Sequence, residues 1–512
     1  MGVAGHQLHA LVAEATGKGL TQHGSSGRFN CIFYGWVIVA VCILCKIFKV
    51  QGQNNVMSYT VPHLLQDFGL SHAELGGFFS VATILAGLVQ PLLGHAVDRL
   101  GARVCIPMMQ VTLCGALFAF ATWTSPPSRL MLYSEVVLIF FFLRMLSLGA
   151  AETFPNTCVQ QWFQRRRGRA VGVVFTFQWL GIAVIGKCVS GIVASNGWQK
   201  AALAGSAANL LLAPISATLL RRSPEACGLQ PDGWTAVAAD EEMESVGIRD
   251  ADEAPPLGTR KIRDLWPQFA FTFFYAVMFG GSDFYMVEMV AEAWPEDLDV
   301  SLFIFGPMAL TAAVSTPLVG ELMDAWSKAH RRLPIVLLAA AGFVTAVATF
   351  WLTCIRSRTS AVLYGVIRGT TTGALNAVHD GVVPSCFRIF RIGHAVWPGV
   401  FQSLLSAGLA FTALGVRREE IGRVLGYNQL CTLVGTGVGP FWYGTFRDVF
   451  GAFRFGLLLS ALPPLMLGIF FASQACAELP AKGHRKPAEE ATSPNYQENV
   501  VLGAITEEVR AG

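Results

Sequence analysis

The chain has 512 residues, of which 53% are hydrophobic and only 14% are charged. Because an ordinary soluble domain carries roughly 25% charged residues, this composition and a mean hydropathy of +0.49 predict that most of the chain lies in lipid. The formal net charge of +3 gives no electrostatic reason to expect nucleic acid as a partner.

The twelve cysteines are scattered singly through apolar runs, a pattern typical of small buried side chains rather than a disulfide framework. The sequence contains no nucleotide-binding loop, nucleophile motif or metal-ligand spacing. We therefore expect neither an enzyme nor a bound cofactor or metal.

Residues 1–30 are rich in Gly, His and Ser and lack the apolar stretch of a secretory signal. We predict a cytosolic N-terminal segment here, with an organellar transit peptide as the alternative.

Twelve apolar stretches follow, each near the length of about 20 residues that a helix needs to cross a bilayer. They lie at 34–60, 73–97, 104–124, 130–156, 169–192, 200–220, 265–291, 300–323, 333–355, 361–385, 421–446 and 453–474.

Basic residues gather in alternate connections between these stretches, which indicates the cytosolic side and predicts that both termini are cytosolic. The basic residues concerned are Arg99, Arg103, Arg165, Arg166, Arg167, Arg169, Arg221, Arg222, Arg331, Arg332, Arg417 and Arg418.

The stretches divide into two groups of six, which predicts a helical bundle over 31–222 and a second one over 265–475. A polar linker over 223–264 joins them, and a polar tail follows over 476–512. We expect the linker and the tail to be cytosolic.

Two short patterns in the first half recur at a constant spacing in the second, which indicates an internal duplication. One recurs 226 residues later, and its members are Pro91, Gly94 and Asp98, then Pro317, Gly320 and Asp324. The other recurs 224 residues later, and its members are Arg144, Gly149 and Phe163, then Arg368, Gly373 and Phe387.

The second half carries about thirty extra residues near 388–418. Phe163 precedes Gly168 by five residues, whereas Phe387 precedes the matching Gly422 by 35. We favour a re-entrant or surface-lying helix, because a thirteenth span would carry the last two helices to the wrong side. A retained non-native segment and a true thirteenth span are the alternatives.

The sequence Gly94-x-x-x-Asp98-Arg99-x-Gly101-x-Arg103 between two apolar stretches resembles the signature loop of the major facilitator superfamily, and Gly320 and Asp324 repeat part of it. The resemblance implies an all-α membrane protein with twelve transmembrane helices in two six-helix halves, which work by alternating access. The expected gating-loop residues are Gly94, Asp98, Arg99, Gly101, Arg103, Gly320 and Asp324.

Ionisable side chains within the apolar stretches gather in the first, fourth, seventh and tenth, with Lys187 in the fifth as an exception. Such groups are costly in hydrocarbon and by default face a cavity or a partner, and in the fold that the sequence resembles these four helices line the central path. The predicted substrate and ion path consists of Lys46, Lys49, Arg144, Glu152, Asp283, Glu288, Arg368, Asn376, His379 and Asp380.

Two readings of these charges stay open. Arg144 and Arg368 suit a substrate carboxylate, because the guanidinium fork matches two oxygens. Alternatively, Lys49–Asp283 and Arg144–Glu152 are permanent ion pairs that only hold helices together. The candidates for a proton-binding group are Asp283, Glu288, His379 and Asp380.

Local features resemble the monocarboxylate-porter and oxalate/formate-antiporter branch, among them Tyr34-Gly35-Trp36 and Gln160-Gln161-Trp162-Phe163. The resemblance implies a transporter of a small organic solute, with a monocarboxylate as the favoured class and proton coupling left open. In the branch that the sequence resembles, monocarboxylate carriers use an arginine in the eighth helix, and oxalate exchangers use basic residues in the eighth and eleventh. The eighth stretch here has no arginine and the eleventh no lysine, so the resemblance argues against oxalate and leaves a monocarboxylate as the favoured class only.

The alternative is a non-transporting membrane receptor or scaffold on the same fold, since fold does not settle function. A transporter of another small solute is a further possibility. The plasma membrane is the favoured location and an organellar membrane the alternative; the sequence leaves open whether the protein has a protein partner.

Overall fold

The computed structural model describes residues 33–163, 167–231, 279–294, 299–326, 333–380 and 421–477, together with Phe273, Ala276 and Val277. Every regular element over these residues is a helix, so the prediction of an all-α protein is confirmed. Four predicted features lie largely or wholly outside the described residues: the segment 1–30, the linker beyond 231, the insertion 388–418 and the tail beyond 477.

The first half contains six stretches of helix close to the predicted spans. The first stretch is broken into short pieces, and the fourth is continuous from Arg129 to Trp162 although its geometry changes on the way. The helices are α2 (Gly35–Phe48), η1 (Val50–Gly52), α3 (Asn54–Met57), α4 (Val61–Phe68), α5 (His72–Leu100), α6 (Ala102–Ala121), α7 (Arg129–Leu143), η2 (Arg144–Ala150), α8 (Ala151–Trp162), α9 (Arg167–Asn196) and α10 (Trp198–Leu219).

The described helices of the second half also lie close to the predicted spans, and the backbone is helical over 279–284 as well. They are α14 (Met286–Ala293), η6 (Ser301–Phe305), α15 (Gly306–Trp326), α16 (Leu333–Leu352), α17 (Arg358–Asp380), α20 (Ile421–Phe450), α21 (Arg454–Ser460) and α22 (Leu462–Ala477).

Local sequence explains where α5 begins and ends. The Ser71 hydroxyl accepts a hydrogen bond from Glu74 N at 3.1 Å, and the Glu74 carboxylate accepts one from Ser71 N at 2.9 Å. This reciprocal capping satisfies two backbone donors at the helix start. The helix stops at Gly101, whose φ of +82° suits a residue without a side chain.

The distribution of side chains is that of a protein surrounded by lipid. Leu92 and Leu211 on the outside are each 70% exposed, whereas Lys46 and Arg144 in the interior are 0% exposed. Five of the described helices are long and apolar enough to cross a membrane. Apolar surfaces facing outward and charges facing inward are expected where the solvent is hydrocarbon.

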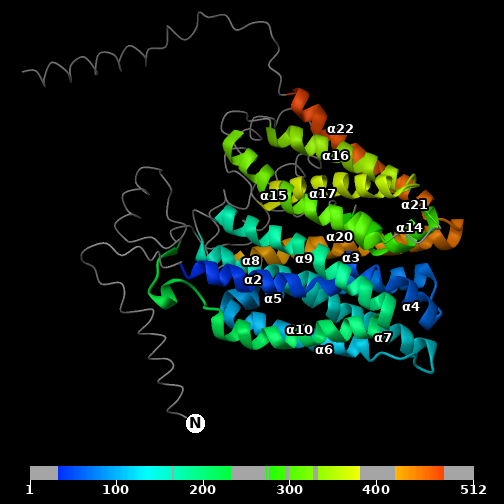
Figure 1. The fold of residues 1–512 in the computed structure, drawn as a ribbon. Coiled ribbons are helices and arrows are strands. Elements are labelled where there is room, and N and C mark those ends of the chain that lie inside the picture. The colour runs from blue at the N-terminus through cyan, green and yellow to red at the C-terminus, as the bar shows by residue number, and fades with distance from the viewer. Residues whose placement is uncertain are drawn as a thin grey trace, which may run out of the picture.

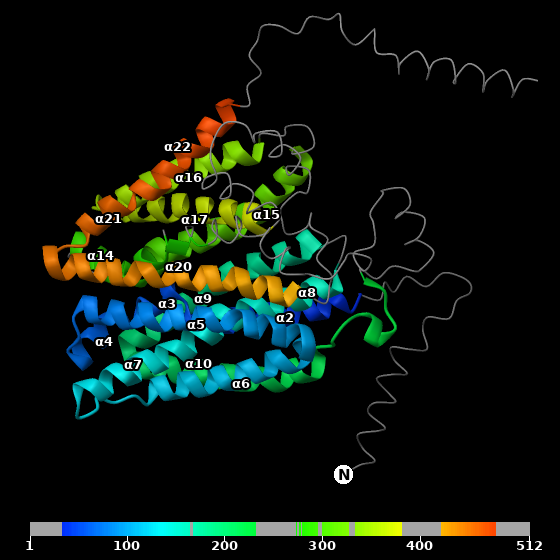
Figure 2. The same cartoon turned by 180° about the vertical axis from the view of Figure 1, so that it is seen from behind.

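The two halves lie against each other along two pairs of helices. From the first half, α5 packs on α20 and α9 packs on α15, and both views show α20 running beside α5 (Figures 1 and 2). We call the end of the bundle where α5 begins the His72 end, and the opposite end, where α5 turns into α6, the Gly101 end.

Candidate functional site

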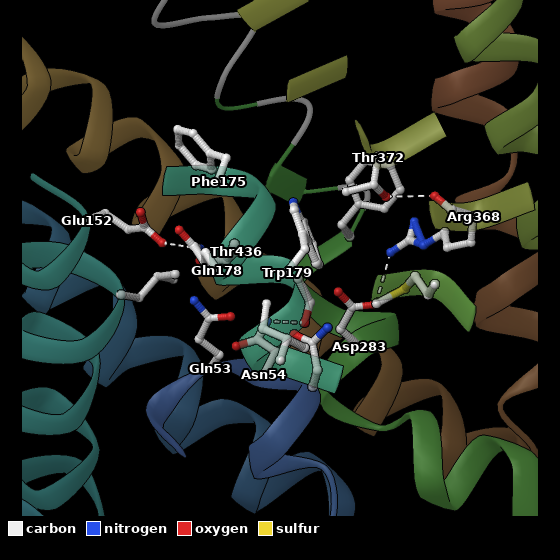
Figure 3. Close-up of a pocket in the computed structure, with 16 residues that line it drawn as sticks. Gln53, Asn54, Glu152, Phe175, Gln178, Trp179, Asp283, Arg368, Thr372 and Thr436 are labelled. Atoms are coloured by element: carbon white, nitrogen blue, oxygen red, sulfur yellow. Dashed lines mark hydrogen bonds and ion pairs between the residues drawn. The ribbon is translucent and has the colours of Figure 1, made fainter. Parts of the chain in front are cut away.

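A cavity of about 190 Å³ lies between the two halves, with walls from both. A single water molecule needs about 10–15 Å³ on this measure, so the cavity has room for a small organic solute. Its walls combine amides, aromatic rings and charges (Figure 3). The polar and aromatic members are Gln53, Asn54, Asn55, Glu152, Phe175, Gln178, Trp179, Phe279, Asp283, Arg368, Thr372 and Thr436.

One wall is built around Glu152 of α8. Lys46 Nζ lies 2.6 Å from Glu152 Oε2, and Lys49 Nζ contacts Glu152 Oε1. Gln178 of α9 completes the group, because its Nε2 donates to Glu152 Oε1 at 2.8 Å while its Oε1 accepts from Lys46 at 3.0 Å. The Lys46 ammonium also lies 4.1 Å from the centre of the Phe175 ring. Two lysines thus share one carboxylate.

The opposite wall carries an ion pair between an arginine and an aspartate. Arg368 Nη2 of α17 donates to Asp283 Oδ1 at 2.9 Å, and its guanidinium carbon lies 3.7 Å from the centre of the Phe279 ring. Figure 3 shows this pair across the cavity from Glu152. An arginine over a phenylalanine ring gains cation–π attraction in addition to its ion pair.

Arg144 lies just behind the cavity wall and is fully buried. Its three hydrogen bonds go to neutral oxygens: the Thr83 hydroxyl at 3.2 Å, the Gly52 carbonyl at 3.0 Å and the Thr436 hydroxyl at 3.4 Å. The last of these, Thr436, lines the cavity itself. A buried guanidinium held only by neutral acceptors is an unusual and costly arrangement.

The alternative reading names Lys49–Asp283 and Arg144–Glu152 as ion pairs, and both pairings are wrong. Glu152 faces both lysines and Asp283 faces Arg368, because α8 approaches the end of α2, whereas the helix that carries Asp283 approaches α17. Spacing along a single helix does not reveal which neighbour it meets.

The charges around the cavity do not balance among the described residues. Four cations, at positions 46, 49, 144 and 368, face two carboxylates, at positions 152 and 283. The other two acidic residues of the predicted path do not enter this count. Glu288 lies at the His72 end, 3.8 Å from His72 Nε2. Asp380 ends α17 together with Asn376 and His379, where the structure describes the backbone alone. The described cavity is thus electropositive.

Lys187, the exception in the fifth span, is also accounted for. Its side chain is 53% exposed and pairs with Asp299 across the boundary between the halves. It lies outside the cavity lining, so its charge needs no place in the predicted path.

The signature loop places the carboxylate of Asp98 against the other half. Asp98 Oδ1 and Oδ2 accept hydrogen bonds from the backbone N–H groups of Gly422 and Arg423, each at 2.7 Å. The carboxylate thus caps the start of α20. Arg99 and Arg103 are exposed near the turn at Gly101, and for Gly320 and Asp324 in α15 the backbone alone is described.

Sequence reasoning missed most of the uncharged cavity wall. Gln53, Asn54 and Asn55 are consecutive amides, each 7% exposed, at a break in the first span. Three polar amides within an apolar stretch were the available signal. Phe175 and Trp179 carry no such signal, since aromatic residues are common in transmembrane helices.

The comparison with known proteins gives a family and several transporters. The model described as Major Facilitator Superfamily matches residues 43–388. The chain is 31% identical over 183 residues to the 4-hydroxybenzoate transporter PcaK of Acinetobacter baylyi. This match covers 35% of this chain and 37% of that one. It is 25% identical over 414 residues to the gallate transporter of Pseudomonas putida, covering 75% of this chain and 87% of that one.

Solved structures share the fold. The xylose transporter XylE from E. coli has a TM-score of 0.57 at 14% identity, covering 88% of this chain and 100% of that one. A bacterial homologue of the human lysosomal transporter Spinster has a TM-score of 0.57 at 15% identity, covering 87% and 97%. At such identities the likeness concerns the fold alone. The chain belongs to the Major Facilitator Superfamily, and it is a multi-pass integral membrane protein of a transporter family rather than an enzyme.

Proposed function

We propose that this protein carries an organic anion across the membrane by alternating access, and that its substrate is an aromatic monocarboxylate moved together with a proton. The observation that carries the proposal is the excess of buried cations over carboxylates among the described residues at the cavity, above all Arg144. The members of the superfamily to which the chain belongs move solutes through a midplane site between the two halves.

Arg144 supports an anionic substrate because its charge has no carboxylate among its hydrogen-bond partners. Burying a charge without a counter-charge is expensive, and a bound anion removes that cost. The Thr436 hydroxyl lies between the guanidinium and the cavity, so a small movement of this side chain brings the arginine into contact with a substrate.

The aromatic walls support a substrate with a ring. Phe175 and Trp179 from α9 and Phe279 from the second half line the same cavity as the amides. Flat rings stack well against aromatic side chains, and the amides offer partners for hydroxyl groups. Two curated relatives are named for 4-hydroxybenzoate and gallate, each of which has one carboxylate and at least one hydroxyl on a benzene ring.

The proposed orientation places both termini in the cytosol of a plasma-membrane protein, so that the Gly101 end is the cytosolic one. It rests on the basic residues of that end, where Arg222 donates to the Arg99 carbonyl at 3.2 Å. The acidic residues Asp67, Glu288 and Asp448 lie at or near the other end, as the positive-inside rule favours.

The test is uptake of labelled 4-hydroxybenzoate, gallate and lactate into proteoliposomes, in wild type and in Arg144→Ala. Loss of a hydrogen bond to a charged group costs about 1.5–3 kcal/mol, so we expect a roughly 10- to 150-fold higher KM in Arg144→Ala. Arg129→Ala is the matched control, because Arg129 begins the same membrane span but its side chain is 66% exposed.

Uptake of the aromatic acids by wild type and by Arg129→Ala, with the expected loss in Arg144→Ala, supports the proposal. Folded wild-type protein that takes up none of the three acids contradicts it and favours a receptor or a different solute. Equal uptake of lactate and 4-hydroxybenzoate contradicts the aromatic preference alone.

A further inference from the structure

Glu152 separates the two lysines from the cavity. Its side chain is 13% exposed and lines the cavity, whereas Lys46 and Lys49 are 0% exposed and do not line it. A substrate carboxylate that enters the cavity therefore meets Glu152 first. The anion can reach the two ammonium groups only if the Glu152 carboxylate leaves them.

The opposite wall is arranged differently. Arg368 lines the cavity itself, as does its partner Asp283, so this carboxylate does not separate the guanidinium from the cavity. Of the two carboxylates that the described residues place at the cavity, Glu152 alone stands between a substrate and the cations that hold it. This asymmetry assigns the two acids different tasks.

We infer that Glu152 is the coupling residue of the transport cycle, a built-in carboxylate that exchanges places with the substrate's carboxylate on Lys46 and Lys49. This inference rests on the proposed function and names the group that takes the transported proton. The substrate anion binds the two lysines, Glu152 turns away into the cavity, and the released carboxylate binds one proton.

The replacement of the Glu152 carboxylate by the substrate's carboxylate leaves the net charge of the site unchanged. Before binding, two ammonium groups face one carboxylate; afterwards they face the substrate's carboxylate, while Glu152 is neutral. One anion and one proton have entered together, so the site keeps its net charge. A carboxylate that loses its cationic partners inside a protein binds a proton in preference to remaining a bare charge.

Among the described residues, no other charged group faces Glu152 and would compete with the substrate's carboxylate for the two lysines. The charged groups facing it are Lys46 and Lys49 from α2 and its end, and α9 contributes the neutral Gln178. Arg144 lies in the same span, but its hydrogen bonds go to Thr83, Gly52 and Thr436 rather than to Glu152. The amide of Gln178 can keep a partner in both states, because it both donates and accepts.

The experiment compares two transport modes of 4-hydroxybenzoate in proteoliposomes: exchange of labelled for unlabelled substrate at equal pH, and net uptake driven by an imposed inward proton gradient. For one proton per anion, a gradient of one pH unit supports about tenfold accumulation. Rates in protein-free liposomes are subtracted, because the neutral acid crosses lipid unaided.

We expect Glu152→Gln to keep exchange while losing the response of net uptake to the gradient. Glu152→Asp retains a proton-binding carboxylate and should keep the gradient response at a lower rate. The matched control is Glu135→Gln, the same substitution in the same membrane span, at a residue that accepts a hydrogen bond from Trp123 Nε1 outside the cavity. It should behave as wild type in both modes.

Two results would overturn the inference. One is a Glu152→Gln protein whose net uptake still follows the gradient as in wild type. The other is a monodisperse Glu152→Gln protein that loses exchange as well, because Glu152 would then only hold the lysines in place. A wild-type protein with no exchange of any aromatic acid contradicts the proposed function instead, so the two failures are distinguishable.

Discussion

Gly94 shows at the scale of one residue why the signature loop needs a glycine. A Cβ atom added to Gly94 would lie 2.1 Å from the Gly422 carbonyl oxygen and 3.0 Å from Gly426 Cα. The neighbouring groups are backbone atoms of the opposite half, which cannot turn aside as a flexible side chain can. The glycine therefore allows α5 and α20 to approach closely enough for Asp98 to cap α20.

We expect Gly94→Ala to force the two halves apart at the Gly101 end. Overpacking of this kind costs about 1–3 kcal/mol, which should appear as a lower apparent Tm in detergent and a lower transport rate. Gly77→Ala is the matched control, because Gly77 lies in the same helix and also faces α20, but its added Cβ would meet Phe441 at an ordinary 3.5 Å. An equal loss in both variants would argue against the close approach as the cause.

At the scale of an element, the π-helical turn η2 sets the position of Arg144. Two amides hold carbonyl groups of this segment: Gln90 Nε2 of α5 donates to the Met145 carbonyl at 3.2 Å, and Gln429 Nε2 of α20 donates to the Leu148 carbonyl at 2.6 Å. Leu148 lines the cavity. Short π-helical turns occur often at functional sites, and here one is supported from the opposite half.

Gln429→Leu leaves the Leu148 carbonyl without this donor, so we expect the turn to shift and Arg144 to move with it. Loss of a partner for a buried polar group costs about 1–3 kcal/mol, and the KM for the anionic substrate should rise at least about fivefold. Gln110→Leu removes a buried amide that bonds Cys45 Sγ instead; it should lower stability while leaving KM unchanged. An unchanged KM in Gln429→Leu would show that η2 does not depend on α20.

The sequence predicted the helices well and their contacts poorly. The span expected at 73–97 is α5, His72–Leu100, and the one expected at 421–446 is α20, Ile421–Phe450, because apolar length and flanking charge are local properties. The π-helical turn could not be predicted, since it depends on Gln90, 55 residues before Met145, and on Gln429, 281 residues after Leu148. The pairing of Glu152 with both lysines was not predicted, for the same reason.

At the scale of the whole molecule, the two halves are joined across their boundary at both ends. At the His72 end, Asp448 Oδ1 lies 3.3 Å from His72 Nδ1 and Asp448 Oδ2 accepts from Ala73 N at 2.7 Å, while Lys187 pairs with Asp299. At the Gly101 end, Asp98 joins α5 to α20. Alternating access requires that the contacts of one end break while those of the other hold.

Asp448→Ala should therefore favour the state that is open at the His72 end. Removing the contacts of this carboxylate with His72 and Ala73 shifts the equilibrium by about 1–3 kcal/mol, or 5- to 150-fold. The measurement is the rate at which a membrane-impermeant maleimide labels Asn55→Cys in the cavity wall, applied from the His72 side, with the exposed Cys188, Cys227 and Cys354 replaced by serine.

Asp67→Ala is the matched control for this prediction, because Asp67 is near the same end but accepts its hydrogen bond from Trp198 Nε1, within the first half. Loss of the Asp67 carboxylate should leave the labelling rate of Asn55→Cys at the wild-type value, since this removes no contact between the halves. Equal labelling in both variants would mean that Asp448 does not hold the halves together. Faster labelling in Asp448→Ala alone would identify α5 and α20 as the helices that separate when the cavity opens, because Asp448 of α20 contacts the first turn of α5.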